Sequence, residues 1–269
     1  MTRGRRLKRI LTIVMVATLV VTFMPQFDVA QVNASTENAT RVPVLTYHHV
    51  GKKGKGKLTI SKAKFRSQMN WLKKRGYKTL TMNEFVEWYE GKRTIPKKSV
   101  LITFDDGTKG VRKYAVPILK RNGQHATIFI IGKYVPKQRA HHMSASTINS
   151  LRKGSVIDIE SHGYGLHDRD KGRKPVKKWS KEKLKSDCMK MHDKYGCTTL
   201  CYPWGSTSNK IRAALSETGV YRVAFTYARI GEYQGTKNKY AYRSSSRYLI
   251  PRITIPGNKS WKYIKKYIK

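Results

Sequence analysis

The sequence predicts a single α/β domain, a barrel of about seven parallel strands covered by helices. Short apolar runs alternate with amphipathic segments of helical period along nearly all 269 residues. Strands that alternate with helices favour a parallel sheet with helices on its faces. About seven such units suit a sheet that closes, or nearly closes, into a barrel, and in such folds the chemistry lies at the carboxyl ends of the strands.

The expected strands are short apolar runs, several of them rich in β-branched and aromatic residues, as buried strands are. They are expected at residues 43–48, 100–104, 126–131, 156–160, 198–202, 221–225 and 248–255. The first helix begins at the capping residue Ser61, carries Phe65, Met69 and Leu72 on one face, and ends at Gly76. Further helices are expected at 82–89, 111–121, 144–153, 180–194, 209–217 and 258–269, the last one basic.

The chain is strongly basic, with 56 Lys and Arg against 16 Asp and Glu and a formal charge of +40. Such a charge favours a polyanionic partner and does not decide the fold. We expect anionic cell-wall polymers, bound by charge, and no specific nucleic acid. The alternative is a lysine-rich solvated surface that adheres without a specific site.

The first 34 residues are expected to form a secretory signal peptide. Five cations precede an uncharged run from residue 10 to 24, and small residues follow at the cleavage spacing. The alternative is an uncleaved membrane anchor, although the run is short for a span. Residues 35–42 then read as a linker and 43–269 as the domain. The protein is expected to be secreted and retained at the cell surface, with membrane contact only if the segment is uncleaved.

Three cysteines, Cys188, Cys197 and Cys201, argue against a disulfide framework because their number is odd. They also lack the C-x-x-C spacing of a zinc ribbon. We expect them to be buried as small apolar groups, and one disulfide among them is left open.

Reactive residue types follow four of the expected strands, where a parallel barrel would gather them at one edge. These are His48 and His49, Asp105 and Asp106, Ser161 and His162, and Pro203 and Trp204. In SHGYGLH, residues 161–167, only a curled loop brings His162 and His167 together, and its two glycines permit the curl. Two imidazoles and one carboxylate can bind a metal ion with positions left open, while the second Asp stays free as a base.

These motifs resemble the polysaccharide deacetylases of the NodB-homology type, carbohydrate esterase family 4, over roughly residues 42–256. TFDDG, residues 103–107, is similar to the first family motif and implies Asp105 as catalytic base and Asp106 as metal ligand. SHGYGLH is similar to the second and implies His162 and His167 as the other ligands. The implied cofactor is a divalent ion, zinc first, with cobalt, nickel and iron as alternatives.

Other segments extend the resemblance. The wider histidine spacing and YHHV, residues 47–50, look like the branch that acts on poly-β-1,6-N-acetylglucosamine. This implies His48 as general acid, with His49 as the local rival. CYPWG, residues 201–205, is similar to the third motif at the groove. It implies that the backbone amide of Tyr202 holds the oxyanion and that Pro203, the next residue, belongs to the same substrate-facing segment. Trp204 is expected to form a sugar-facing wall or, alternatively, simply to pack in the core. Arg252 is expected to orient the base, or else to form a structural ion pair.

The resemblance therefore implies a metal-dependent N-deacetylase that acts on N-acetylglucosamine residues of an extracellular polysaccharide, in a biofilm matrix for this branch. Peptidoglycan is the alternative substrate for the same chemistry, and an acetyl esterase acting on xylan is a weaker one. A different class of function is a non-catalytic surface binder that holds anionic glycan by charge. A binder has no need of the Asp–Asp–His–His set, which favours the enzyme.

Overall fold

The computed structural model describes residues 37–136, 141–168, 174–230 and 235–268. The chain divides into the units Met1–Asn33 and Ala34–Lys269. The predicted signal peptide, residues 1–34, lies outside the described residues, and its boundary stays a prediction. Within the described part, no helix has the length and apolar character to cross a membrane.

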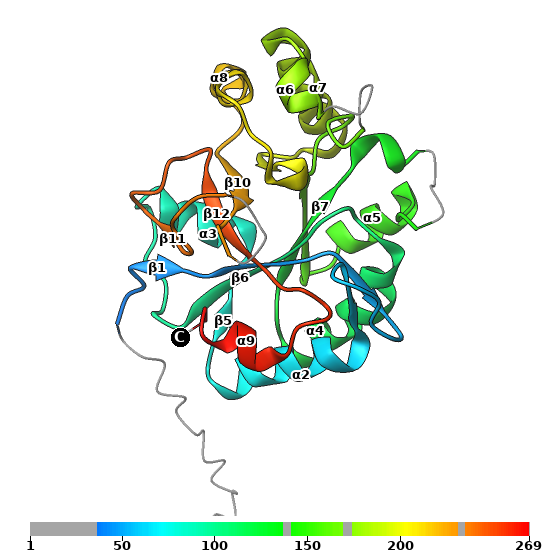
Figure 1. Cartoon of the computed structure of the whole chain (residues 1–269), viewed down its shortest axis with the longest axis vertical. Coiled ribbons are helices and arrows are strands. Elements are labelled where there is room, and N and C mark those ends of the chain that lie inside the picture. Colours follow the sequence, from blue (N-terminus) through cyan, green and yellow to red (C-terminus); the bar gives the residue numbers. More distant parts are fainter. Residues whose placement is uncertain (1–36, 137–140, 169–173, 231–234, 269) are drawn as a thin grey trace, which may run out of the picture. The chain divides into compact units, whose positions relative to one another are not determined.

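Seven parallel strands form a closed barrel, which confirms the predicted fold class (Figure 1). The order around the barrel is β2, β12, β10, β9, β8, β7, β6 and back to β2. Closure comes from pairing of β2 with β6, where Val44 lies opposite Leu101 and Tyr47 opposite Phe104. The strands are β2 (Val44–Tyr47), β6 (Ser99–Phe104), β7 (Ala126–Ile130), β8 (Ile157–Ser161), β9 (Thr199–Cys201), β10 (Val223–Tyr227) and β12 (Ile250–Thr254).

Five short strands lie beside the barrel. They are β1 (Arg41–Val42), which pairs with β11 (Ala241–Tyr242), β3 (His49–Gly51), which pairs with β4 (Thr59–Ser61), and β5 (Lys78–Thr79), which pairs with the start of β6. The described residues of the expected linker are therefore attached to the domain. The amide of Ala39 also donates to the carbonyl of Ile95 at 2.9 Å.

Apart from α6 (Pro175–Lys178), which no predicted helix covers, the helices lie close to where the sequence predicts them. They are α2 (Lys62–Lys74), α3 (Met82–Tyr89), α4 (Val116–Asn122), α5 (Ala145–Arg152), α6 (Pro175–Lys178), α7 (Lys181–Tyr195), α8 (Asn209–Thr218) and α9 (Trp261–Lys265). Short turns of helix are η1 (Val111–Ala115), η2 (Gly132–Tyr134) and η3 (Pro203–Gly205). As expected, the Ser61 hydroxyl accepts from the amide of Lys64 and caps α2.

Two helices differ from the expectation. The segment expected as one helix over 111–121 begins as the π-helical turn η1 and becomes α4 around Pro117, which has no amide hydrogen to continue a regular ladder. The basic terminal helix is confined to α9. Beyond it the chain leaves the helix, so that Ile268 is buried and its carbonyl accepts from the Tyr77 hydroxyl.

Helix α3 packs against the barrel strands through one of the buried apolar clusters. Phe85 contacts the ring of Phe225 on β10, with centroids 5.5 Å apart, and the indole of Trp88 donates to the carbonyl of Ala39. Both side chains have no exposed surface. Burial of aromatic rings in this cluster therefore links α3 to the strands that carry the site.

We expect Phe85→Ala to lower the free energy of unfolding by about 3–5 kcal/mol, because it removes a fully buried ring and leaves a cavity. Leu58→Ala is the control, since Leu58 is 53% exposed; it should change stability by less than about 0.5 kcal/mol. Urea denaturation measures both. Equal losses in the two variants would contradict the packing described for α3.

Candidate active site

The carboxyl ends of the barrel strands bring most of the predicted site residues together. Asp105 and Asp106 follow β6, His48 follows β2, and His162 follows β8. Arg252 lies on β12, which pairs with β2. Because all these strands are parallel, their ends meet at one edge of the barrel, as the sequence predicts.

Asp105 and Arg252 form a buried ion pair at the centre of this edge. Arg252 Nη1 lies 2.7 Å from Asp105 Oδ1, and Nη2 lies 2.9 Å from Oδ2, so the guanidinium holds both carboxylate oxygens. Neither residue has exposed surface. The predicted contact between Arg252 and the base is thus present, and the paired geometry fixes the plane of the carboxylate.

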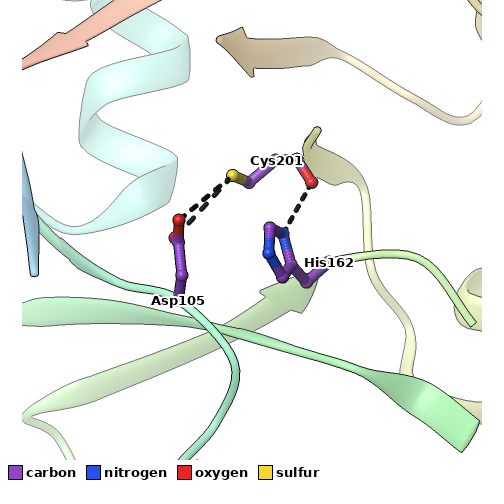
Figure 2. Close-up of side chains that lie close together, drawn as sticks. All are labelled: Asp105, His162 and Cys201. Carbon is purple, nitrogen blue, oxygen red and sulfur yellow. Dashed lines mark hydrogen bonds between the residues drawn. The ribbon is translucent and has the colours of Figure 1, made fainter. Parts of the chain in front are cut away.

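The charges around Asp105 keep it ionised. Burial alone would raise its pKa, but the charge of Arg252, with smaller effects from His162 and His48, outweighs burial and lowers the pKa below its ordinary value. The thiol of Cys201 lies 3.7 Å and 3.8 Å from the two carboxylate oxygens (Figure 2). Asp105 is therefore a carboxylate held in place from two sides.

Asp106 faces the two histidines of the SHGYGLH loop. Its Oδ1 lies 3.6 Å from Nε2 of His162 and 3.3 Å from Nε2 of His167. The backbone makes this possible, because Asp106 and Gly107 both have left-handed φ values, 70° and 67°, and turn the second carboxylate away from the first. A left-handed aspartate is uncommon and is typical of functional sites. Although burial would raise the pKa of Asp106, hydrogen bonding to His167 and the charges nearby lower it.

The tautomer of His162 suits a metal ligand. Its Nδ1 lies 2.8 Å from the carbonyl oxygen of Cys201, which can only accept, so Nδ1 carries the hydrogen (Figure 2). This leaves a lone pair on Nε2, the atom that faces Asp106, and such a backing hydrogen bond is typical of metal-bound histidine. Burial lowers the pKa of His162 to about 4, despite the two carboxylates nearby. The imidazole is therefore neutral at ordinary pH.

Two sets of side chains in the described part of the chain have the spacing of a metal site. One is Asp106, His162 and His167, and the other is Asp105, His162 and Cys201. In the second set, Arg252 already occupies both oxygens of Asp105, and the Cys201 thiol donates to the same carboxylate. The first set has two imidazoles and a carboxylate without a guanidinium partner. It is the set that fits a divalent ion.

His48 and His49 point to different neighbours, as adjacent residues of an extended segment do. His48 Nε2 lies 3.8 Å from Asp105 Oδ2. The ring of His49, in β3, instead bonds through Nδ1 to the hydroxyl of Thr108 at 3.0 Å. Of the two rivals, His48 is the one placed beside the predicted base.

In the CYPWG segment, the backbone amide of Tyr202, which was expected to be available to the oxyanion, makes a hydrogen bond within the barrel. The amide of Tyr202 donates to the carbonyl of Phe225 at 3.0 Å, and its side chain is fully buried. This amide, predicted to hold the oxyanion, is thus already engaged with the neighbouring strand β10, and its oxyanion role stays a prediction. Pro203, next in η3, has no amide hydrogen.

Trp204 lies beside the metal-ligand candidates. Its φ of 54° is left-handed, and its half-buried ring contacts that of His167, with centroids 4.6 Å apart. The ring therefore flanks the site, as the predicted wall would. Cys201 was not predicted to touch the site. The only signal in the sequence is its place at the end of an expected strand.

We expect Arg252→Met to lower stability at pH 7 by about 3–5 kcal/mol, because it leaves Asp105 buried without its counter-ion. In the wild type the lowered pKa means that ionised Asp105 contributes stability above its unfolded pKa of about 3.9, and this is lost as the pH falls through the folded pKa. In the variant, unopposed burial raises the pKa, so stability falls as the pH rises. The deficit should therefore be larger at pH 7 than at pH 4.

The double variant Arg252→Met with Asp105→Asn is the control, since it removes both charges. It should be more stable at pH 7 than Arg252→Met alone, measured by thermal unfolding across this pH range. Equal deficits at pH 4 and pH 7 would show that the pair is not the source of the loss.

Comparison with known proteins agrees with the fold and the motifs. The family model described as polysaccharide deacetylase matches residues 92–223. A Bacillus subtilis (strain 168) protein whose name places it among the polysaccharide deacetylases, YxkH, is 30% identical over 237 residues, covering 87% of this chain and 78% of that protein. The poly-beta-1,6-N-acetyl-D-glucosamine N-deacetylase of Staphylococcus aureus (strain MSSA476) is 29% identical over 219 residues, covering 78% and 72%.

Two solved structures share the fold. The Streptococcus pyogenes deacetylase PplD, in complex with acetate, superposes with a TM-score of 0.73 at 18% identity and covers 86% of this chain and 99% of that one. IcaB from Ammonifex degensii superposes with a TM-score of 0.71 at 23% identity, covering 86% and 97%. From the sequence relationship and its motifs, this chain belongs to the polysaccharide deacetylase family.

Proposed function

We propose that this protein is a metal-dependent N-deacetylase that removes acetyl groups from N-acetylglucosamine residues of an extracellular polysaccharide. The observation that carries the proposal is that the adjacent carboxylates of Asp105 and Asp106 have different partners. Asp105 is held ionised by Arg252, while Asp106 faces two imidazoles. This arrangement supports a role for Asp105 as base and for Asp106 as ligand, the two roles that metal-assisted amide hydrolysis uses.

Asp106, His162 and His167 would hold the ion, with zinc first and cobalt, nickel or iron as alternatives. When bound, a divalent ion supplies Lewis acidity to the acetyl carbonyl and favours deprotonation of water. Asp105 accepts the proton from the attacking water, whose oxygen bonds to the acetyl carbon. His48, 3.8 Å from Asp105, donates a proton to the glucosamine nitrogen as the C–N bond breaks. The products are acetate and a free amine.

The substrate within this class is proposed to be poly-β-1,6-N-acetylglucosamine of a biofilm matrix. The five-residue spacing of His162 and His167 and the YHHV segment support this choice, and the S. aureus relative is named for that substrate. Peptidoglycan is the alternative polymer. The basic N-terminal pattern and the formal charge of +40 support export and retention at an anionic cell surface.

We expect acetate release from poly-β-1,6-N-acetylglucosamine to exceed release from peptidoglycan, and both to stop when a chelator removes the metal. Re-addition of zinc should restore activity. A faster reaction on peptidoglycan would reverse the substrate assignment. Binding that salt abolishes, without any acetate release, would instead support the non-catalytic binder.

Asp105→Asn should lower the rate of deacetylation by about 10²–10⁴-fold, the usual contribution of a general base. Metal content should be retained, because Asp106 and not Asp105 faces both histidines. Acetate release and metal stoichiometry are measured on the same preparation. Unchanged turnover would remove Asp105 from the mechanism, and loss of the metal would make it a ligand.

A further inference from the structure

We propose that Asp187 is a positioning residue, which holds the loop between His162 and His167 in the shape that aims both imidazoles at Asp106. Asp187 lies on α7, outside the residues that the family motifs single out. The inference rests on the proposed metal-dependent function. It adds a residue that fixes the ligand loop without touching metal or substrate.

The contact is made by both oxygens of the carboxylate. Asp187 Oδ1 accepts from the amide of Tyr164 at 2.8 Å, and Oδ2 accepts from the amide of Gly165 at 2.6 Å. These two residues form the middle of the loop, between one histidine and the other. Asp187 is only 6% exposed, so water competes little for these hydrogen bonds.

Further backbone groups of the loop are held by Ser161 at the end of β8 and by the turn η2. Gly163 donates to the hydroxyl of Ser161 at 3.0 Å. On the far side, the amides of Gly132 and Lys133 donate to the carbonyls of Gly163 and Tyr164 at 3.1 Å and 3.0 Å. The turn η2 thus holds two of the loop carbonyls, and α7 holds the two central amides through a single side chain.

The tight loop cannot offer its two amides another acceptor unless its backbone moves. Gly163 has a left-handed φ of 80°, and a Cβ there would lie 2.5 Å from that of Leu166, so the turn is tight. A Cβ on Gly165 would lie 3.3 Å from Asp187 Oδ2 and 3.4 Å from Trp179. Without the carboxylate, the buried amide of Gly165 and the partly buried amide of Tyr164 would lack an acceptor and would have to open towards water. Such a movement displaces His167, two residues beyond Gly165.

Burying the carboxylate of Asp187 costs free energy, and this cost favours a specific role for the residue. Burial raises the pKa of Asp187 to about 6, although both amide contacts act in the opposite direction. The sequence carries a signal that goes with this. Leu184, Cys188 and Met191 form the buried face of α7, and Asp187 falls on that same face. An acid on the apolar face of a helix needs a polar partner inside the fold.

The test is zinc affinity of the full-length protein, with Asp187→Asn as the main variant. Asparagine keeps the shape but offers one acceptor oxygen in place of two. We expect zinc to bind 10–100-fold more weakly, the usual effect of removing a group that orients a ligand. Turnover should fall at limiting zinc and recover largely at saturating zinc, with little change in KM. The absorption spectrum of the Co²⁺-loaded protein should also change.

Two controls separate positioning from general destabilisation. Asp193→Asn changes an exposed acid on the same helix and should leave zinc affinity unchanged. Leu215→Ala removes a buried side chain of α8, which packs on α7; it should lower Tm but not zinc affinity. Wild-type affinity in Asp187→Asn, or an equal loss in Leu215→Ala, would overturn the proposal. A wild-type protein that binds no zinc would refute the proposed function itself.

Gly165→Ala perturbs the same contact from the loop side. If Gly165 and Asp187 act through one contact, the double variant with Asp187→Asn should not bind zinc more weakly than whichever single variant has the lower zinc affinity. If the fold-losses in zinc affinity of the two single variants instead multiply in the double variant, Asp187 does not act through its contact with Gly165. That result would also overturn the proposal.

Discussion

Pairing between β2 and β6 closes the barrel, and the candidate active site depends on this closure. It places His48, at the end of the first barrel strand, beside Asp105, at the end of the second. Because β12 pairs with the other side of β2, Arg252 reaches the same point from the last strand. Residues almost 150 positions apart in sequence meet because parallel strands present their carboxyl ends to one edge.

The arrangement explains how a very basic chain accommodates two adjacent acids in a buried place. Neighbouring carboxylates would raise each other's pKa if they shared an environment. The left-handed turn at Asp106 and Gly107 accompanies different nearest contacts for the two side chains, although both lie near His162. Asp105 receives a guanidinium, and Asp106 receives two imidazoles. Against burial, the charge of Arg252 lowers the pKa of Asp105, and hydrogen bonding to His167 is the largest effect that lowers the pKa of Asp106.

Much of this could be predicted from the sequence, because strand ends in a parallel barrel converge and the motifs follow the strands. What could not be predicted depends on contacts between distant elements. The amide of Tyr202 is used by the sheet, and only the pairing of β9 with β10 reveals it. Cys201 and Asp187 make contacts across the fold, with Asp105 and with the loop between His162 and His167. The sequence around Cys201 predicts the end of an apolar strand, and that around Asp187 predicts the buried face of a helix. Neither segment indicates which distant residue the side chain contacts.

The central claim is that Asp106, His162 and His167 hold the metal while Asp105 stays on Arg252. X-ray absorption spectroscopy of the zinc-loaded protein tests it most directly. We predict that the zinc ion has only nitrogen and oxygen neighbours, at about 2.0–2.2 Å, with scattering from two imidazoles. A sulfur neighbour at about 2.3 Å would place the ion on Cys201 with Asp105. That result would contradict the assignment of Asp105 as the free base.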